Sequence, residues 1–201
     1  MKARRTLTLA VVTAAFLAGT AVPAAAAAAT DYSTGLVTYN CTFPGVGVQP
    51  VTAVAGFGGP DAVAAGSPIA VENFSGGMAV SPDLYKLMAV YLGYDGVRGS
   101  GTLPIAAENA LPGTANVGVT IPEVFWDPLN RAFYFQHPGP VASFTAGSPG
   151  SAAFRWGSPF TLAIEFHFKG NNTWRPWTMN CALRVSSPPQ NPYFSPSLPV
   201  D

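Results

Sequence analysis

Charged residues are scarce in this chain. Ten Lys or Arg and ten Asp or Glu together make up 10% of its 201 residues. Nucleic-acid binding requires clustered Lys and Arg that displace counterions from phosphates. No such cluster is present, so the composition predicts no nucleic-acid partner.

Residues that commonly carry chemistry are also few. His137 and His167 are the only two histidines, and no His-rich or Asp-rich spacing is typical of a metal site. We therefore predict neither a metal nor a cofactor. No serine lies in the Gly-x-Ser-x-Gly elbow of many hydrolases.

The best acid/base pair is Glu165 with His167. The two residues lie two apart on the outward face of an expected strand, at roughly 6.5 to 7 Å along the backbone. They keep open the alternative of a secreted hydrolase. The other interpretation is a pair of solvated groups on an exposed face.

The first 29 residues have the pattern of a secretory signal peptide. Basic residues at positions 2, 4 and 5 precede an apolar run from Leu7 to Val22 and a zone of small residues. We expect cleavage between Ala26 and Thr30, export from the cell, and no membrane anchor afterwards. Removing three of the ten basic residues leaves seven against ten acidic ones, so the mature chain is mildly acidic.

Glycine and proline are abundant, with 21 and 20 copies, which is typical of many short strands and turns. The predicted fold is all-β: a single β-sandwich over residues 30–185, immunoglobulin-like or jelly-roll-like. Expected strands lie at 35–43, 46–54, 97–105, 116–121, 131–136 and 152–156, with one or two more within 63–78 and another possible at 141–144. The Pro-rich residues 186–201 have no periodic apolar face and are expected to be extended or disordered.

The strongest pattern is a hairpin over residues 160–185. Apolar residues alternate with polar ones in both arms, so each arm has one buried face. With a turn at Gly170 to Thr173, Phe166 would face Trp177, Ile164 would face Met179, and Leu162 would face Cys181.

Cys41 and Cys181 each fall on the inward face of an expected strand. In an exported protein two such cysteines predict a disulfide, here tying the first strand to the last. Closing a loop of about 140 residues contributes roughly 5 kcal/mol in the chain-entropy model. The wide separation argues against an ordinary immunoglobulin domain, whose bridged strands lie closer in sequence.

One short helix is expected from Ser81 to Gly93. Ser81 suits the N-cap, Pro82 the first turn, and Gly93 a left-handed stop. The stripe formed by Leu84, Leu87, Met88 and Tyr91 would cover the open end of the sandwich or dock on a partner.

Two tryptophans are candidate ligand contacts. Trp174 is expected at the hairpin tip beside Asn172 and Arg175, and Trp126 precedes a turn at Asp127-Pro128. An exposed indole near amide and guanidinium groups can stack on a sugar or anchor a protein. Tryptophans packed into loops are the alternative interpretation.

Three segments together resemble a known family. They are Tyr39-Asn40-Cys41-Thr42-Phe43-Pro44-Gly45, then Ser81-Pro82-Asp83-Leu84 leading to Leu92-Gly93 and Val97-Arg98-Gly99-Ser100, and finally Cys181-Ala182-Leu183. In this order they resemble secreted actinobacterial proteins known only as a domain of unknown function. The resemblance implies an extracellular β-sandwich and no particular reaction, ligand or catalytic residue. The Pro-rich tail after Cys181 departs from it.

The sequence thus favours a secreted, non-catalytic module that binds a cell-wall polymer, glycan or surface protein. A hydrolase using Glu165 and His167 is one alternative. A carrier of an apolar small molecule is another, based on the aromatic-rich interior and the helical stripe. The oligomeric state is not predicted.

Overall fold

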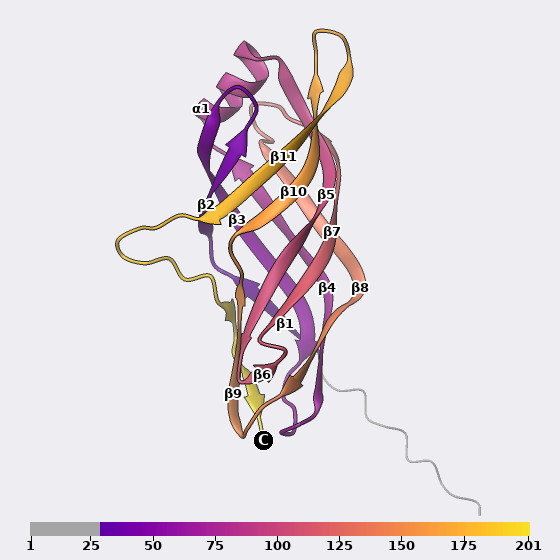
Figure 1. The fold of residues 1–201 in the computed structure, drawn as a ribbon, viewed down its shortest axis with the longest axis vertical. Coiled ribbons are helices and arrows are strands. Elements are labelled where there is room, and N and C mark those ends of the chain that lie inside the picture. The colour runs from indigo at the N-terminus through magenta and orange to yellow at the C-terminus, as the bar shows by residue number, and fades with distance from the viewer. Residues whose placement is uncertain (1–28) are drawn as a thin grey trace, which may run out of the picture.

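The computed structural model describes residues 29–201, and almost all of this range forms β-strands (Figure 1). The expected signal peptide falls on residues 1–28, which lie outside the described range. The elements in chain order are β1 (Ala29–Thr34), β2 (Val37–Phe43), β3 (Gly47–Pro60), β4 (Pro68–Val80), α1 (Pro82–Tyr85), η1 (Lys86–Tyr91), β5 (Tyr94–Glu108), β6 (Ala110–Leu111), β7 (Thr114–Phe125), β8 (Ala132–Ala146), β9 (Gly150–Trp156), β10 (Phe160–Phe168), β11 (Thr173–Leu183), β12 (Phe194–Ser195) and β13 (Leu198–Val200).

The strands form one antiparallel sheet that closes on itself. Strands β2, β3, β4 and β8 make one half, and β7, β5, β10 and β11 make the other. The two halves join at one edge through three β2–β11 residue pairs and at the other through the single pair Thr120 and Gln136. These narrow joints give two facing halves around a common core, so the all-β, sandwich-like class predicted from the sequence is confirmed.

The core lies between the two halves and is rich in aromatic side chains. Trp156 is central, because its ring lies 5.0 Å from Tyr39, 5.5 Å from Phe135 and 5.8 Å from Phe160. All four side chains are buried. Packed rings of this kind fill space closely and contribute stability beyond their buried area.

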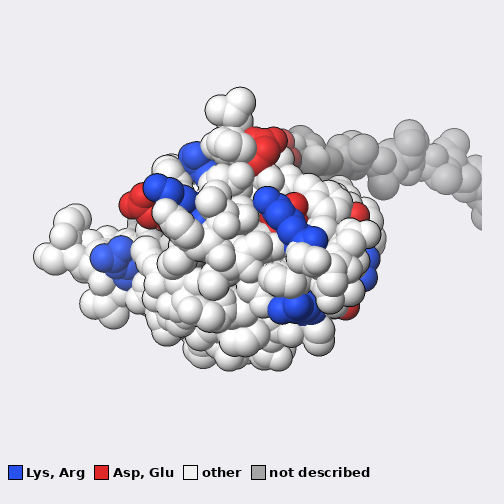
Figure 2. All heavy atoms as spheres, turned by 90° about the horizontal axis from the view of Figure 1, so that it is seen from above, with Lys and Arg blue, Asp and Glu red and all other residues white. Residues whose placement is uncertain are grey.

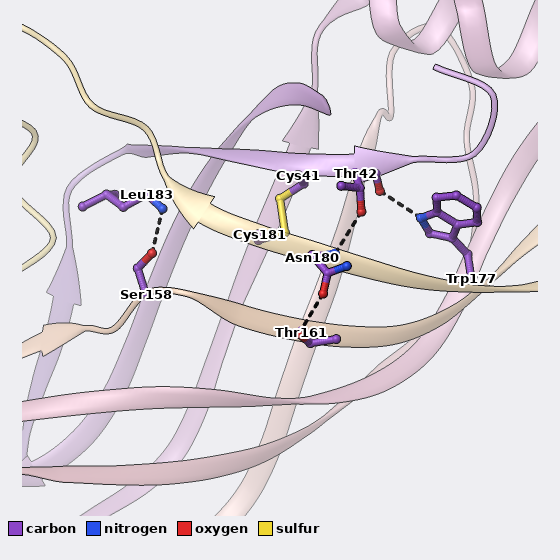
Figure 3. Close-up of a disulfide and its surroundings, with 8 residues drawn as sticks. All are labelled: Cys41, Thr42, Ser158, Thr161, Trp177, Asn180, Cys181 and Leu183. Atoms are coloured by element: carbon purple, nitrogen blue, oxygen red, sulfur yellow. Dashed lines mark hydrogen bonds between the residues drawn. A yellow bond between two sulfur atoms is a disulfide. The ribbon is translucent and has the colours of Figure 1, made fainter. Parts of the chain in front are cut away.

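The predicted disulfide is confirmed. Cys41 on β2 pairs directly with Cys181 on β11, and their sulfurs are bonded at 2.05 Å (Figure 3). Both residues are buried, as their inward phase predicted. The bonded strands are neighbours in the sheet; β1 precedes them in the chain and β12 and β13 follow, so they are not the first and last strands.

The hairpin over β10 and β11 forms, but its register differs from the prediction by two residues. Phe166 pairs with Arg175, Ile164 with Trp177, Leu162 with Met179, and Phe160 with Cys181. The turn is Lys169 to Asn172, because Asn172 adopts a φ of 53° and the Lys169 amide donates to the Gly93 carbonyl at 2.9 Å. A shift of two residues keeps every side chain on its predicted face.

The expected helix is present in two parts. The Ser81 hydroxyl accepts a hydrogen bond from the Leu84 amide at 3.1 Å, and Gly93 has a φ of 76°. The chain changes from α to π geometry after Tyr85. This widened turn rotates the stripe, so Leu84, Met88 and Ala89 are buried whereas Leu87 and Tyr91 are exposed. No helix of residues 29–201 is long and apolar enough to cross a membrane.

The Pro-rich tail is part of the folded unit rather than disordered. Phe194 begins β12, which pairs with β1, and its ring lies 4.9 Å from that of Phe57. β13 pairs with β9 on one side, and Val200 bridges to Val63 on the other. Phe194, Leu198 and Val200 of the tail are buried against the lower end of the core, so folded structure continues past residue 185 (Figure 1).

Candidate functional site

A cluster of polar and aromatic side chains lies on the outer face of the sheet, near the end that carries the helix. We call it the outer-face cluster. Four neighbouring strands contribute to it: β7, β5, β10 and β11. Its members are Asp95, Arg98, Glu123, Phe125, Glu165, His167, Asn172 and Trp174.

The register of the four strands builds the cluster. Gly96 of β5 stands opposite both Phe125 of β7 and His167 of β10, and His167 in turn stands opposite Trp174 of β11. A Cβ atom at Gly96 would lie 3.1 Å from His167 Cβ and 3.1 Å from Phe125 Cδ1. The missing side chain therefore lets the Phe125 and His167 rings meet, with 5.0 Å between centroids.

His167 is held by hydrogen bonds at both ring nitrogens. Nδ1 lies 2.6 Å from Asp95 Oδ1, and Nε2 lies 2.8 Å from Asn172 Oδ1. Both partner atoms are oxygens that accept hydrogen bonds, an arrangement that favours the doubly protonated, charged form of the ring. The hydrogen bond to Asp95, reinforced by that to Asn172, raises the pKa of His167 above its ordinary value.

This geometry corrects the expectation that Glu165 and His167 share a solvated face. His167 points outward as predicted, but only 8% of it is exposed, because Phe125 and Trp174 flank its ring. Glu165 Oε2 accepts from Arg98 Nε at 2.7 Å instead of contacting the histidine. The two residues therefore belong to separate polar pairs.

Trp174 lies between these pairs. The Arg98 guanidinium carbon is 4.2 Å from the indole centroid, and the His167 ring centroid is 5.1 Å from it. Arg98 is itself oriented by Glu165 and by Glu123, whose Oε2 lies 3.3 Å from its Nη1. The indole is thus fixed in place while part of it stays exposed, next to Phe125, which is 49% exposed.

The other candidate residues predicted from the sequence do not all lie in the outer-face cluster. Asn172 joins the cluster through its hydrogen bond to His167. Arg175 lies on the opposite face of β11 from Trp174 and contacts Phe168, with 3.6 Å between its guanidinium carbon and the ring centroid. Trp126 is buried and packs on Phe166, so it is not a surface contact. The turn after it forms as predicted, with Asp127 Oδ1 accepting from the Leu129 and Asn130 amides at 2.7 Å each.

Sequence reasoning missed Asp95, Arg98, Glu123 and Phe125. The Asp95-Gly96 pair predicts a turn, but both residues lie within β5, where Asp95 is the hydrogen-bond partner of His167. Glu123 and Phe125, like Glu165 and His167, lie two residues apart on a strand, so the sequence could have predicted that they share one face of the sheet. Which strands lie side by side was not available from the sequence.

Charged groups of both signs surround this end of the molecule, separated by uncharged surface (Figure 2). Within residues 29–201 no three His, Cys, Asp or Glu side chains gather as metal ligands would. The outer-face cluster presents oriented hydrogen-bonding groups around partly exposed aromatic rings.

The model of a family of unknown function, DUF6801, matches residues 38–195. The chain belongs to this family. The DUF6801 match includes both cysteines and the whole outer-face cluster. No curated protein and no solved structure matches the chain.

Proposed function

We propose that this DUF6801 protein is an exported, non-catalytic module that binds a cell-surface glycan polymer through the outer-face cluster. The observation that carries the proposal is the fixed, partly exposed Trp174 beside the exposed Phe125. Aromatic rings held in place before binding lose little conformational entropy when a ligand stacks on them.

The flanking groups suit a hydroxyl-rich ligand. Carboxylates of Glu123 and Glu165 accept hydrogen bonds, and the Arg98 guanidinium donates them, all next to the indole. Sugar hydroxyls both donate and accept, so alternating acceptors and donors around a ring match them. The same arrangement also suits a protein loop, which the experiment below separates from a glycan.

The state of His167 supports a non-catalytic role. A general base needs a nitrogen free to accept a proton, and a general acid needs a proton directed at the substrate. Both nitrogens of His167 are occupied by Asp95 and Asn172, and Glu165 is paired with Arg98. A hydrolase using Glu165 and His167 would have to break these contacts first.

Two further features bear on the other parts of the proposal. The buried disulfide supports folding in an oxidising compartment, in agreement with the predicted signal peptide. The packed aromatic core weighs against carriage of an apolar molecule inside the sheet.

The test is binding of the disulfide-bonded protein to purified cell-wall fractions and to a glycan array. We expect retention on a glycan fraction, and a loss of at least tenfold in affinity for Trp174→Ala and Phe125→Ala. Tyr134→Ala is the matched control, because Tyr134 is an exposed aromatic on β8 outside the cluster. Retention only by protein components, or equal loss in the control, would contradict the proposal.

A further inference from the structure

A hollow that is separate from the outer-face cluster lies beside the hairpin of β10 and β11, where β2 and β11 separate. Their pairing covers only the residues Cys181 to Leu183 of β11. To the right of the disulfide in Figure 3 the two strands diverge, and the gap is bridged by the Trp177 indole, whose Nε1 donates to the Thr42 carbonyl at 2.9 Å. A pocket of about 190 Å³ remains beside the indole.

Aromatic and proline side chains form most of the walls of this pocket. We call it the Arg175 pocket; it is lined by Pro44, Tyr94, Phe166, Arg175, Pro176 and Trp177. Phe166 is fully buried, and Trp177 is tethered to Thr42. Because these side chains are fixed without a ligand, little ordering is needed when one binds.

Arg175 supplies the only charge in the lining. Its guanidinium stacks on Phe168 and lies 5.9 Å from the Tyr94 ring centroid. No carboxylate of residues 29–201 forms an ion pair with it. A planar guanidinium is weakly hydrated and matches a carboxylate through two parallel hydrogen bonds.

Another hollow in the described part of the chain has the opposite character. It lies at the far end of the sheet, and its lining includes Asp31 and Glu72 with no cation. An anion would be repelled there and attracted at Arg175. The contrast in charge therefore points to the Arg175 pocket as the site for an acid.

We propose that the Arg175 pocket binds a small organic acid that carries one carboxylate on one flat apolar ring. The ring lies among Tyr94, Phe166 and Trp177, and the carboxylate pairs with the Arg175 guanidinium. The volume of about 190 Å³ is below the 300 to 1,000 Å³ of typical drug-sized sites, so a single ring is the expected size. This site is separate from the outer-face cluster.

The probe is phenylacetate, added to the ¹⁵N-labelled, disulfide-bonded protein and followed by NMR at the Trp177 indole NH, which is assigned with Trp177→Phe. We expect a saturable shift. Phenylacetamide keeps the ring without the charge and should bind about tenfold more weakly, since hydrogen bonds between charged groups are about twice as strong as neutral ones. Acetate and inorganic phosphate, which lack the ring, should leave the signal in place.

The variants separate this site from the rest of the molecule. Arg175→Gln should weaken phenylacetate binding about tenfold, and Arg175→Lys, which keeps the charge without the planar fork, should weaken it less. Arg184→Gln is the matched control, because Arg184 is an exposed arginine just after β11 and outside the pocket. Trp174→Ala should also leave binding unchanged, whatever it does to glycan binding.

Several results would overturn the proposal. One is no saturable shift with phenylacetate, and another is equal binding of phenylacetamide. Binding that survives unchanged in both Arg175 variants would remove the guanidinium from the site. A shift produced equally by acetate or phosphate would remove the ring.

Discussion

At the scale of single residues, the outer-face cluster shows how one absent side chain organises several present ones. Gly96 leaves the space in which Phe125 and His167 meet. The His167 ring then holds together three segments: the start of β5, the end of β10 and the hairpin turn, through Asp95 and Asn172. The histidine is thus better explained as a structural tether than as a reactive group.

The tether predicts a pH-dependent stability. Asp95 and Asn172 raise the folded-state pKa of His167 above its unfolded value, near 6.5. Its stabilisation is therefore fully present below about pH 6.5 and is lost as the pH rises through the folded-state pKa. Lys169 and Glu123 are the other charged groups close to this pair.

We expect His167→Gln to lower the free energy of unfolding by about 1 to 3 kcal/mol at pH 5.5, with a smaller difference at pH 9. Urea unfolding at several pH values measures both. His137→Gln is the control, because His137 has no carboxylate partner within residues 29–201. A difference that stays constant over this pH range would show that the tether does not depend on the imidazolium charge.

At the scale of elements, β2 and β11 are held together by few contacts. The joint contains three residue pairs, the disulfide, hydrogen bonds involving Thr42 and Trp177 (Figure 3), and one from the Arg184 amide just after β11 to the Thr38 carbonyl of β2. A joint this short depends strongly on its covalent link.

Replacing Cys41 and Cys181 by Ser should therefore destabilise the protein by about 3 to 5 kcal/mol, through loss of the loop constraint and burial of two hydroxyls. Urea unfolding of the double variant measures the loss. Alkylation of the unreduced, denatured wild type, followed by mass spectrometry, checks that no free thiol is present. An unchanged midpoint would mean that the strands pair without the bond.

The tail is the second element whose role is testable. Phe194, Leu198 and Val200 are buried, and each buried side chain of this size contributes about 1.5 to 3 kcal/mol. Ending the chain after Val185 should cost on the order of 5 kcal/mol and expose Phe57, whose ring lies 4.9 Å from that of Phe194. Circular dichroism melting and dye binding to exposed apolar surface would detect this; a truncated chain with wild-type melting would show that the tail is dispensable.

The elements also show where sequence reasoning stops. Alternation located the hairpin and its faces, because side-chain period is a local property. The register was two residues off because the turn depends on Lys169 contacting Gly93, a contact between distant segments. The tail was missed for the same reason: Phe194 and Leu198 find their partners in β1 and β9, and nothing near them in sequence shows this.

The candidate site was predictable only in part. Glu165, His167, Asn172 and Trp174 were found because they lie on one hairpin. Asp95 and Phe125 come from β5 and β7, and only the sheet order β11–β10–β5–β7 brings them alongside. Burial of His167 follows from those neighbours and therefore could not be derived from its own strand.

At the scale of the whole molecule, closure of the sheet depends on β5 lying close to β10. Gly99 has a φ of 152°, and a Cβ atom there would lie 2.3 Å from the Ala163 carbonyl oxygen of β10. The two strands pair along eight residues of β10. No side chain fits at Gly99 without separating them.

Gly99→Ala should accordingly destabilise the protein by about 2 kcal/mol or more. Gly118→Ala on β7 is the matched control, since a Cβ atom at Gly118 would have no neighbour within 4 Å. That control should be neutral or stabilising by about 0.5 to 1 kcal/mol, because alanine loses less backbone entropy. Thermal melts of both variants test this prediction. Equal melting temperatures would show that β5 and β10 can lie farther apart without loss of stability.

The joint between β2 and β11 also determines when folding can be completed. β2 is made early, but its second neighbour lies 140 residues later in the chain. Proteins dominated by such distant contacts fold slowly, because the cost of closing large loops comes before the gain from contacts. We infer that β2 waits with one edge unpaired until nearly the whole chain exists, so folding is completed only after synthesis has passed β11.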